Sequence, residues 1–243
     1  MCATPTATSW SCAVTESSPQ APWTLAGESI VGLAWPRRPL GPFPAGVRPV
    51  PGPVLVAAVR YSGSPVGPYV ELAVGEPARL GVRLGWCMTT MVVDSAEARV
   101  GGRSAWGFPK ELGTLVWDRD GDERSLRWVE RGIEVRGVPA RWRLPVLVPV
   151  RALQRRADGP VIVPGRLRGV ARPARVEVDV RDGGDPLAPL AGRHRGCTVD
   201  GMRFVVRPAR HPFGLASSLR APLAAPEPAL SSSVPSRAYS SAG

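Results

Sequence analysis

Short apolar runs, many of them alternating with polar residues, recur through the middle of the chain. Alternation with a period of two is typical of strands that bury one face, and glycine, proline and aspartate separate the runs. We therefore expect strands at residues 28–35, 53–61, 69–75, 84–94, 114–119, 124–131, 133–138, 140–148, 174–180 and 201–208. The segment 118–125, which reads DRDGDERS, is typical of a hairpin loop.

One segment, residues 94–107, has the pattern of a helix instead. Asp94 or Ser95 can cap its start, and Glu97 follows Asp94 at capping-box spacing. Pro109 ends it. A second short helix is possible at residues 215–223, but the βαβ alternation and glycine motifs of nucleotide-binding folds are absent. These patterns predict a mainly β (α+β) protein with few helices.

The two ends of the chain differ from the middle in composition. Residues 1–20 are rich in Ser, Thr and Ala, and residues 221–243 are rich in Pro, Ala and Ser. Such segments bury too little apolar surface to offset the entropy lost on ordering, so we expect both ends to be disordered and residues 21–220 to form a single domain. The sequence has neither a secretion signal nor an apolar run near the ~20 residues of a membrane span. We expect a cytoplasmic protein without a membrane partner.

Charge and metal-ligating residues narrow the possible functions. The net charge is +11, but the arginines are scattered among the expected strands without a dense basic run, which favours a solvated surface over nucleic-acid binding. A positive field would favour a small anionic substrate. The four cysteines form no C-x-x-C pair and there are only two histidines, so we expect no metal site, no disulfide framework and no cofactor.

Lys110 is the only lysine among 31 basic residues. Arginine and lysine exchange readily on a solvated surface, whereas only lysine can supply a neutral amine that attacks a carbonyl carbon. Lys110 is therefore a candidate for covalent chemistry. The alternative is that it is a chance survivor or an ion-pair lysine.

The segment GRSAWGFPKELG (102–113) resembles the active-site signature of the acetoacetate decarboxylase family, and GPYVEL (67–72) resembles its tyrosine-x-glutamate strand. The looser resemblance extends over roughly residues 21–210. It implies a large antiparallel sheet curled into a cone or barrel with a few peripheral helices, assembled as a homo-oligomer. It also implies a lyase in which Lys110 forms a Schiff base with a small keto acid and Glu71 acts as acid/base or orienting group. Arg103, Trp106, Phe108 and Tyr69 would bind the substrate.

Three positions depart from the family pattern. Glu111 stands where the family has a second lysine, and its charge would favour the protonated amine unless it points away from the pocket. Glu28 stands near the expected carboxylate-binding arginine, and Val56 lies where a second glutamate is expected, fifteen residues before Glu71.

Three hypotheses follow from these departures. The first is a decarboxylase-like lyase, the second a Schiff-base aldolase or dehydratase, and the third a non-catalytic protein that binds small molecules on the same scaffold. Both enzyme hypotheses predict that Lys110 is buried at the base of an apolar cavity with Glu71 within hydrogen-bonding reach.

Overall fold

The computed structural model describes residues 19–212. The expected disorder of residues 1–18 and 221–243, the possible helix at 215–223 and the last part of the expected 21–220 domain lie outside the described residues. Residues 19 and 20 precede the first strand.

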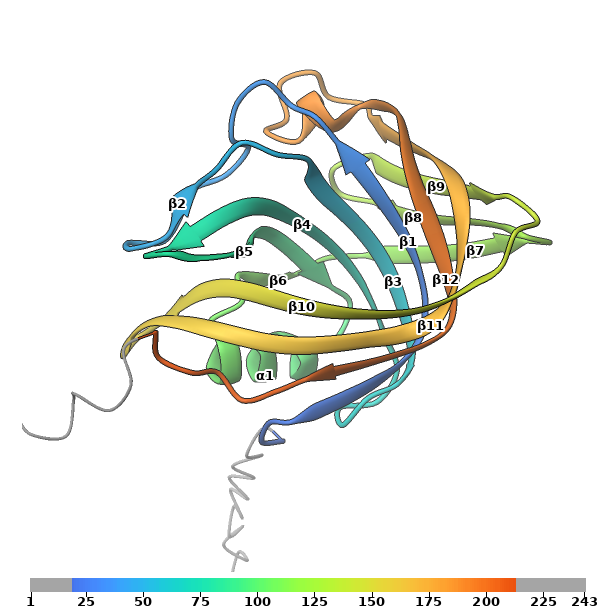
Figure 1. Cartoon of the computed structure of the whole chain (residues 1–243). Helices are drawn as coiled ribbons and strands as arrows, with labels where there is room; N and C mark the ends of the chain where they lie inside the picture. Colours follow the sequence, from blue (N-terminus) through green and yellow to red (C-terminus); the bar gives the residue numbers. More distant parts are fainter. Residues whose placement is uncertain (1–18, 213–243) are drawn as a thin grey trace, which may run out of the picture. The chain divides into compact units, whose positions relative to one another are not determined.

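The described chain is built mainly from strands, and Figure 1 shows their order. A single α-helix, α1 (Ala96–Trp106), and one 3-10 turn, η1 (Ala188–Leu190), occur within residues 19–212, so the few helices expected reduce there to these two. The strands are β1 (Trp23–Ala34), β2 (Arg48–Pro49), β3 (Val54–Gly63), β4 (Tyr69–Leu80), β5 (Arg83–Val93), β6 (Lys110–Leu112), β7 (Leu115–Asp120), β8 (Glu123–Trp128), β9 (Ile133–Pro139), β10 (Leu144–Arg156), β11 (Gly159–Val180) and β12 (Gly192–Val206).

All twelve strands belong to one sheet that closes on itself. The order is β10-β5-β4-β3-β1-β12-β11-β9-β8-β7, and β10 also pairs with β11, which completes a ring. Most pairs are antiparallel, while β5 pairs in parallel with β6 and, at Ala152 and Trp86 alone, with β10. In Figure 1 the hairpin of β10 and β11 passes in front of the curled sheet, and α1 lies beneath it. The mainly β fold with a curled sheet is confirmed.

Successive residues of the strands face two different interiors. On β3, Val54, Val56 and Ala58 belong to a densely packed apolar cluster that also includes residues of β4, β8, β9 and β11. The alternate β3 residues line a cavity on the other face; they are Leu55, Ala57, Val59 and Tyr61. One face of the sheet therefore forms a packed core, while the other combines a second packed cluster with a potential binding site.

The strand predictions locate most elements but omit β2 and β6 and shorten β1, β4 and the last three strands. β10 continues to Arg156 and β11 begins at Gly159, so the hairpin covers residues that the sequence pattern left unassigned. Prolines at 149, 160, 164 and 173 interrupt the apolar alternation, and proline is generally unfavourable within strands. Within residues 19–212, no helix is long and apolar enough to cross a membrane.

Candidate active site

A cavity of about 360 Å³ lies on the concave face of the sheet. Residues of β1, β3, β4, β5, β10, β11 and β12 form its wall, together with the end of α1 and the start of β6. Among the described residues, Lys110 and Glu71 are the charged side chains that line it, and its other polar side chains include the hydroxyls of Ser29, Tyr61 and Tyr69 and the thiol of Cys197.

Lys110 lies at the first position of β6, and only 3% of it is exposed. Its Nζ is 2.6 Å from Oε2 of Glu71, which is itself 5% exposed. Nζ also lies 3.5 Å from the hydroxyl of Tyr69 and 5.0 Å from the centre of that ring. This buried arrangement is the geometry that both enzyme hypotheses predict.

The turn that joins α1 to β6 brings Lys110 to the cavity. Ser95 caps α1 by accepting a hydrogen bond from the amide of Ala98. At the other end, Gly107 adopts a left-handed conformation with φ of 69°, which favours glycine. A Cβ at Gly107 would also overlap the carbonyl oxygen of Arg155. The chain can therefore reverse beside β10 and enter β6 with Lys110 facing inwards.

Gly102 gives the lysine side chain room inside the packed turn. A Cβ at this position would lie 2.7 Å from Cδ and 2.8 Å from Cε of Lys110. Carbon atoms do not normally approach so closely, so any side chain here would displace the lysine. The glycine within the helix is thus explained by the path of Lys110.

Arg103 does not line the cavity, contrary to the substrate-binding role expected from the sequence. The residue is exposed, and its Nε donates a hydrogen bond of 2.7 Å to the backbone carbonyl of Lys110. It therefore fixes the backbone from outside while the Lys110 side chain faces inwards. The motif identifies Arg103, but it does not show that this residue lies on the outer side of α1.

Trp106 and Phe108 do line the cavity, as does Tyr69. The Trp106 ring meets Trp23 edge-on with centroids 5.1 Å apart, and its indole N–H donates to the carbonyl of Arg207. The indole N–H of Trp23 likewise donates to the carbonyl of Pro19. Because both donors are occupied by backbone oxygens, these tryptophans supply apolar wall and no polar group for a ligand.

Both tyrosines of the cavity are neutral. Burial raises the pKa of Tyr69 well above its usual value, and the charge of Glu71 raises it further. The same two causes, in the same order, raise the pKa of Tyr61. Burial also raises the pKa of the Cys197 thiol, so a thiolate nucleophile is disfavoured there. The amine of Lys110 is the candidate nucleophile that the cavity offers.

Glu71 differs from the other buried carboxylate of β4. Glu76 accepts hydrogen bonds from the amides of Leu40 and Gly41 and from the hydroxyl of Thr89, so its oxygens hold a loop in place. Within the described residues, the recorded polar partner of Glu71 is Lys110. Its carboxylate is therefore available to accept or return a proton.

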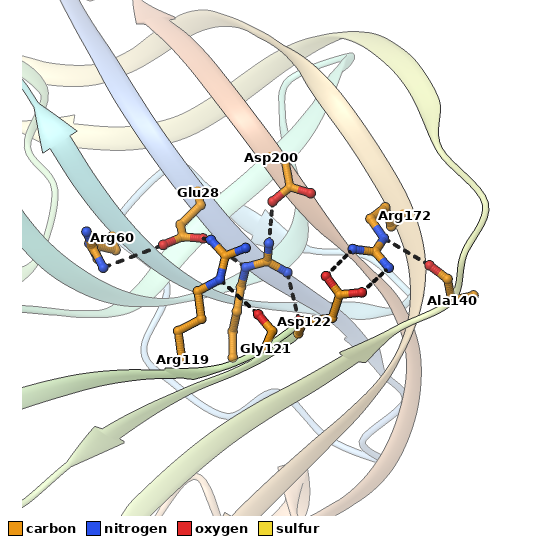
Figure 2. Close-up of polar contacts among 9 residues, drawn as sticks. Glu28, Arg60, Arg119, Gly121, Asp122, Ala140, Arg172 and Asp200 are labelled. Atoms are coloured by element: carbon orange, nitrogen blue, oxygen red, sulfur yellow. Dashed lines mark hydrogen bonds and ion pairs between the residues drawn. The ribbon is translucent and has the colours of Figure 1, made fainter.

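Glu28 does not line the cavity, whereas its neighbour Ser29 does. Figure 2 shows Glu28 among arginine side chains. Its carboxylate pairs with Arg60, Arg119 and the fully buried Arg124. The expectation that Glu28 replaces a carboxylate-binding arginine of the active site is therefore wrong. The cavity-facing positions of β1 are Trp23, Leu25, Ser29 and Val31, so the alternation of the strand places Glu28 on its other face.

Val56 also faces away from the cavity, into the packed cluster behind β3. Counting fifteen residues back from Glu71 therefore reached the wrong face of the strand. Val59 is the residue paired with Glu71, and it lines the cavity. The described lining of the cavity does lack a second glutamate, but Val59, and not Val56, is the β3 residue that lies beside Glu71 there.

Glu111 is exposed on β6, where the pleat turns it away from Lys110. Its charge consequently lies outside the cavity, so Glu111 points away from the pocket, as an extended strand permits. Sequence reasoning did not identify Ser29 or Tyr61 as lining residues. Tyr61 pairs directly with Tyr69 across β3 and β4, so the shared alternation of those two predicted strands could have found it.

Within residues 19–212, no cluster of three His, Cys, Asp or Glu side chains could hold a metal ion.

Comparison with known proteins agrees with this geometry. Residues 41–160 match the family model for acetoacetate decarboxylase. No curated protein sequence matches the chain.

Several solved structures share the fold. Acetoacetate decarboxylase from Legionella pneumophila is 15% identical with a TM-score of 0.60, covering 79% of this chain and 87% of that chain. The enduracididine biosynthesis enzyme MppR, complexed with pyruvate, is also 15% identical with a TM-score of 0.60, covering 81% and 92%. An acetoacetate decarboxylase-like enzyme from Sphingomonas wittichii RW1 is 14% identical with a TM-score of 0.53, covering 77% and 91%. The chain therefore has the acetoacetate decarboxylase-like fold.

Proposed function

We propose that this chain, a divergent member of the acetoacetate decarboxylase family, is a carbon–carbon lyase that forms a Schiff base between Lys110 and a carbonyl substrate. The observation that carries the proposal is the contact of 2.6 Å between Nζ of Lys110 and the carboxylate of Glu71 inside an apolar cavity. Burying two charges costs desolvation free energy even when they are paired, so a buried ion pair in an apolar cavity is unfavourable for stability alone and favours a catalytic role.

The pair can supply the proton transfers that imine formation needs. Glu71 accepts a proton from Nζ, and the neutral amine attacks the carbonyl carbon to give a carbinolamine. Glu71 then returns the proton to the departing hydroxyl, which leaves as water. The products are an iminium cation on Lys110 and a carboxylate on Glu71, so the charge of the resting pair is restored.

The iminium group draws electrons from the neighbouring carbon–carbon bond. In a retro-aldol reaction the β-hydroxyl loses its proton to Glu71, the bond breaks, and an aldehyde and an enamine result. Protonation of the enamine at carbon and attack by water on the iminium release the second product and the free amine. In a decarboxylation the bond to a β-carboxylate breaks instead and carbon dioxide leaves.

The aldol-type reaction is the second candidate, and the cavity lining favours it. A β-keto acid brings a carboxylate, and the described lining contains no arginine to receive it. A hydroxyl group needs no cationic partner, and the tyrosine hydroxyls of the cavity are neutral. Both reactions use the same lysine and the same carboxylate, and neither requires a cofactor.

Reductive trapping tests the common step. The protein is incubated with a panel of ketones, aldehydes and keto acids in the presence of borohydride, and the intact mass is measured. Because Lys110 is the only lysine, peptide mapping distinguishes its adduct from one on the terminal amine. Trapping on Lys110, abolished in Lys110→Arg, is expected. Absence of an adduct across the panel in the folded protein would refute the proposal.

Glu71→Gln tests the proton transfers. Removing a positioned acid/base group typically costs 10²–10⁴-fold, so trapping should slow by roughly that factor. Glu111→Gln is the matched control, since this exposed carboxylate faces away from the cavity, and it should trap at the unaltered rate. Measurement of carbon dioxide and of aldehyde release then separates the two reactions.

A further inference from the structure

The charges of this protein are distributed unevenly between its surfaces. The net charge of +11 comes from arginines, but no arginine lines the cavity within the described residues. Inside it, the single cation is Lys110, and Glu71 compensates that charge at 2.6 Å. The cavity that would hold the substrate is therefore electrically neutral, although the protein as a whole is strongly basic.

A substrate carboxylate would have no favourable partner in this cavity. It would lie in an apolar enclosure, and its nearest fixed charge on one side would be the like charge of Glu71. Buried charges are tolerated when they are paired and hydrogen-bonded, and apart from the Lys110–Glu71 pair the described lining offers neutral polar groups. The lining thus discriminates against the small keto acid that the sequence resemblance suggested.

The size of the cavity gives a second, independent indication. At about 30 Å³ for each water-sized group, its volume of about 360 Å³ holds roughly twelve such groups. Pyruvate has six non-hydrogen atoms, so a three-carbon keto acid would leave about half of the space unfilled. Empty apolar space forfeits contacts, and a ligand of ten to twelve atoms would recover them.

We propose that the substrate of this site is an uncharged, largely aliphatic or aromatic ketone or aldehyde of about ten to twelve non-hydrogen atoms. This inference rests on the proposed Schiff-base function and specifies its substrate class. The carbonyl group meets Lys110 and Glu71. The apolar body lies along residues contributed by β1, β3, β10 and β12, namely Val31, Leu55, Ala57, Val146, Val148 and Phe204.

Ser29 provides one polar handle within this apolar wall. It is 1% exposed and lines the cavity, and its hydroxyl has no hydrogen-bond partner among residues 19–212. It pairs across β1 and β3 with Val59, which pairs in turn with Glu71. Two strand spacings therefore separate the backbones of Ser29 and Glu71, roughly 10 Å. A hydroxyl or ether oxygen at the far end of the substrate would satisfy this group without bringing a charge.

A matched pair of probes tests the substrate class. 2-Nonanone and 8-oxononanoate share a nine-carbon methyl ketone skeleton and differ by a terminal carboxylate. Borohydride trapping on Lys110 is followed for both, and for pyruvate and acetoacetate, as a function of concentration. Half-maximal trapping with 2-nonanone is expected at a concentration at least tenfold lower than with any of the three acids. Equal or better trapping of an acid would overturn the inference while leaving the Schiff-base function intact.

Binding of 2-nonanol separates the ligand class from the chemistry. This alcohol cannot form an imine, and its binding is read from the fluorescence of the cavity tryptophans Trp23, Trp86 and Trp106. Binding of 2-nonanol without any trapped ketone would refute the proposed function alone. Trapping of the acids without binding of 2-nonanol would overturn the substrate class alone.

Two arginine substitutions on β10 complete the test. Val148 lines the cavity and is 45% exposed, so Val148→Arg places a cation at the wall without burying it fully. The variant should shift the ratio of trapping towards 8-oxononanoate by about tenfold. Leu147→Arg is the control, because Leu147 is 55% exposed on the opposite face of the same strand. It adds the same charge and should leave the ratio unchanged; an equal shift in both variants would contradict the inference.

Discussion

Gly102→Ala is the most informative small change, because it adds one methyl group directly against the lysine. The new Cβ would lie 2.7 Å from Cδ and 2.8 Å from Cε of Lys110. Favourable carbon contacts begin near 3.5 Å, so the lysine side chain must move by about 0.7 Å. Nζ, which is 2.6 Å from Glu71, moves with it. Misplacement by 1 Å can cost about a hundredfold in rate, so we expect trapping to slow by roughly 10- to 100-fold.

The fold should survive this substitution. Alanine favours a helix by up to ~1 kcal/mol over glycine, which offsets part of the ~1–3 kcal/mol typical of overpacking. The assay is the rate of borohydride trapping on Lys110, accompanied by thermal unfolding. Gly183→Ala serves as control, since a Cβ there meets no atom of the described part of the chain within 4 Å. Trapping by Gly102→Ala at the rate of the unsubstituted protein would refute the role assigned to this close contact.

Three further predictions concern the turn, the outer ion pairs and the tyrosine. Gly107→Ala should destabilise the fold by ~1–3 kcal/mol in thermal or denaturant unfolding, because φ is 69° there and the methyl meets the Arg155 carbonyl. The hydrogen bond from Arg172 lowers the pKa of Asp122 to about 2, so the unfolded chain binds the extra proton first. Stability should therefore fall as the pH drops from about 4 to about 2, and Asp122→Asn should flatten that dependence in acid denaturation. Tyr69→Phe should slow trapping several-fold with little change in melting temperature, and an unaltered rate would exclude the hydroxyl at 3.5 Å from catalysis.

The strands and the two side chains Lys110 and Glu71 could be predicted from the sequence, because both predictions depend on local sequence patterns. Strand alternation identifies β3, β4 and β5, and the motif around Lys110 together with the spacing around Glu71 marks the two side chains that the sheet brings together. Both patterns are visible in the sequence because a buried strand, or an amine at a defined turn, directly limits which residue types can occupy its positions.

Positions that depend on register could not be predicted in the same way. Plain alternation places Glu28 on the outer face of β1 and Val56 in the packed cluster behind β3, but the sequence alone does not show which face of either strand lines the cavity. The substrate-binding role predicted for Arg103 was wrong for a related reason, since the position of Arg103 relative to the cavity depends on how α1 packs. The neutrality of the cavity also required the structure, because it is a property of residues from eight strands together.

The division of β3 between two interiors has a consequence for how this protein can change. Substitutions at 55 and 57 alter the surface that a ligand meets, 54, 56 and 58 maintain the packed cluster behind it, and 59 and 61 belong both to the cavity wall and to a second packed cluster. Selection on ligand preference can therefore act on residues 55 and 57 while selection on folding acts on their immediate neighbours in the same strand. We expect a combinatorial library confined to positions 55 and 57 to sample new specificities among chains that still fold.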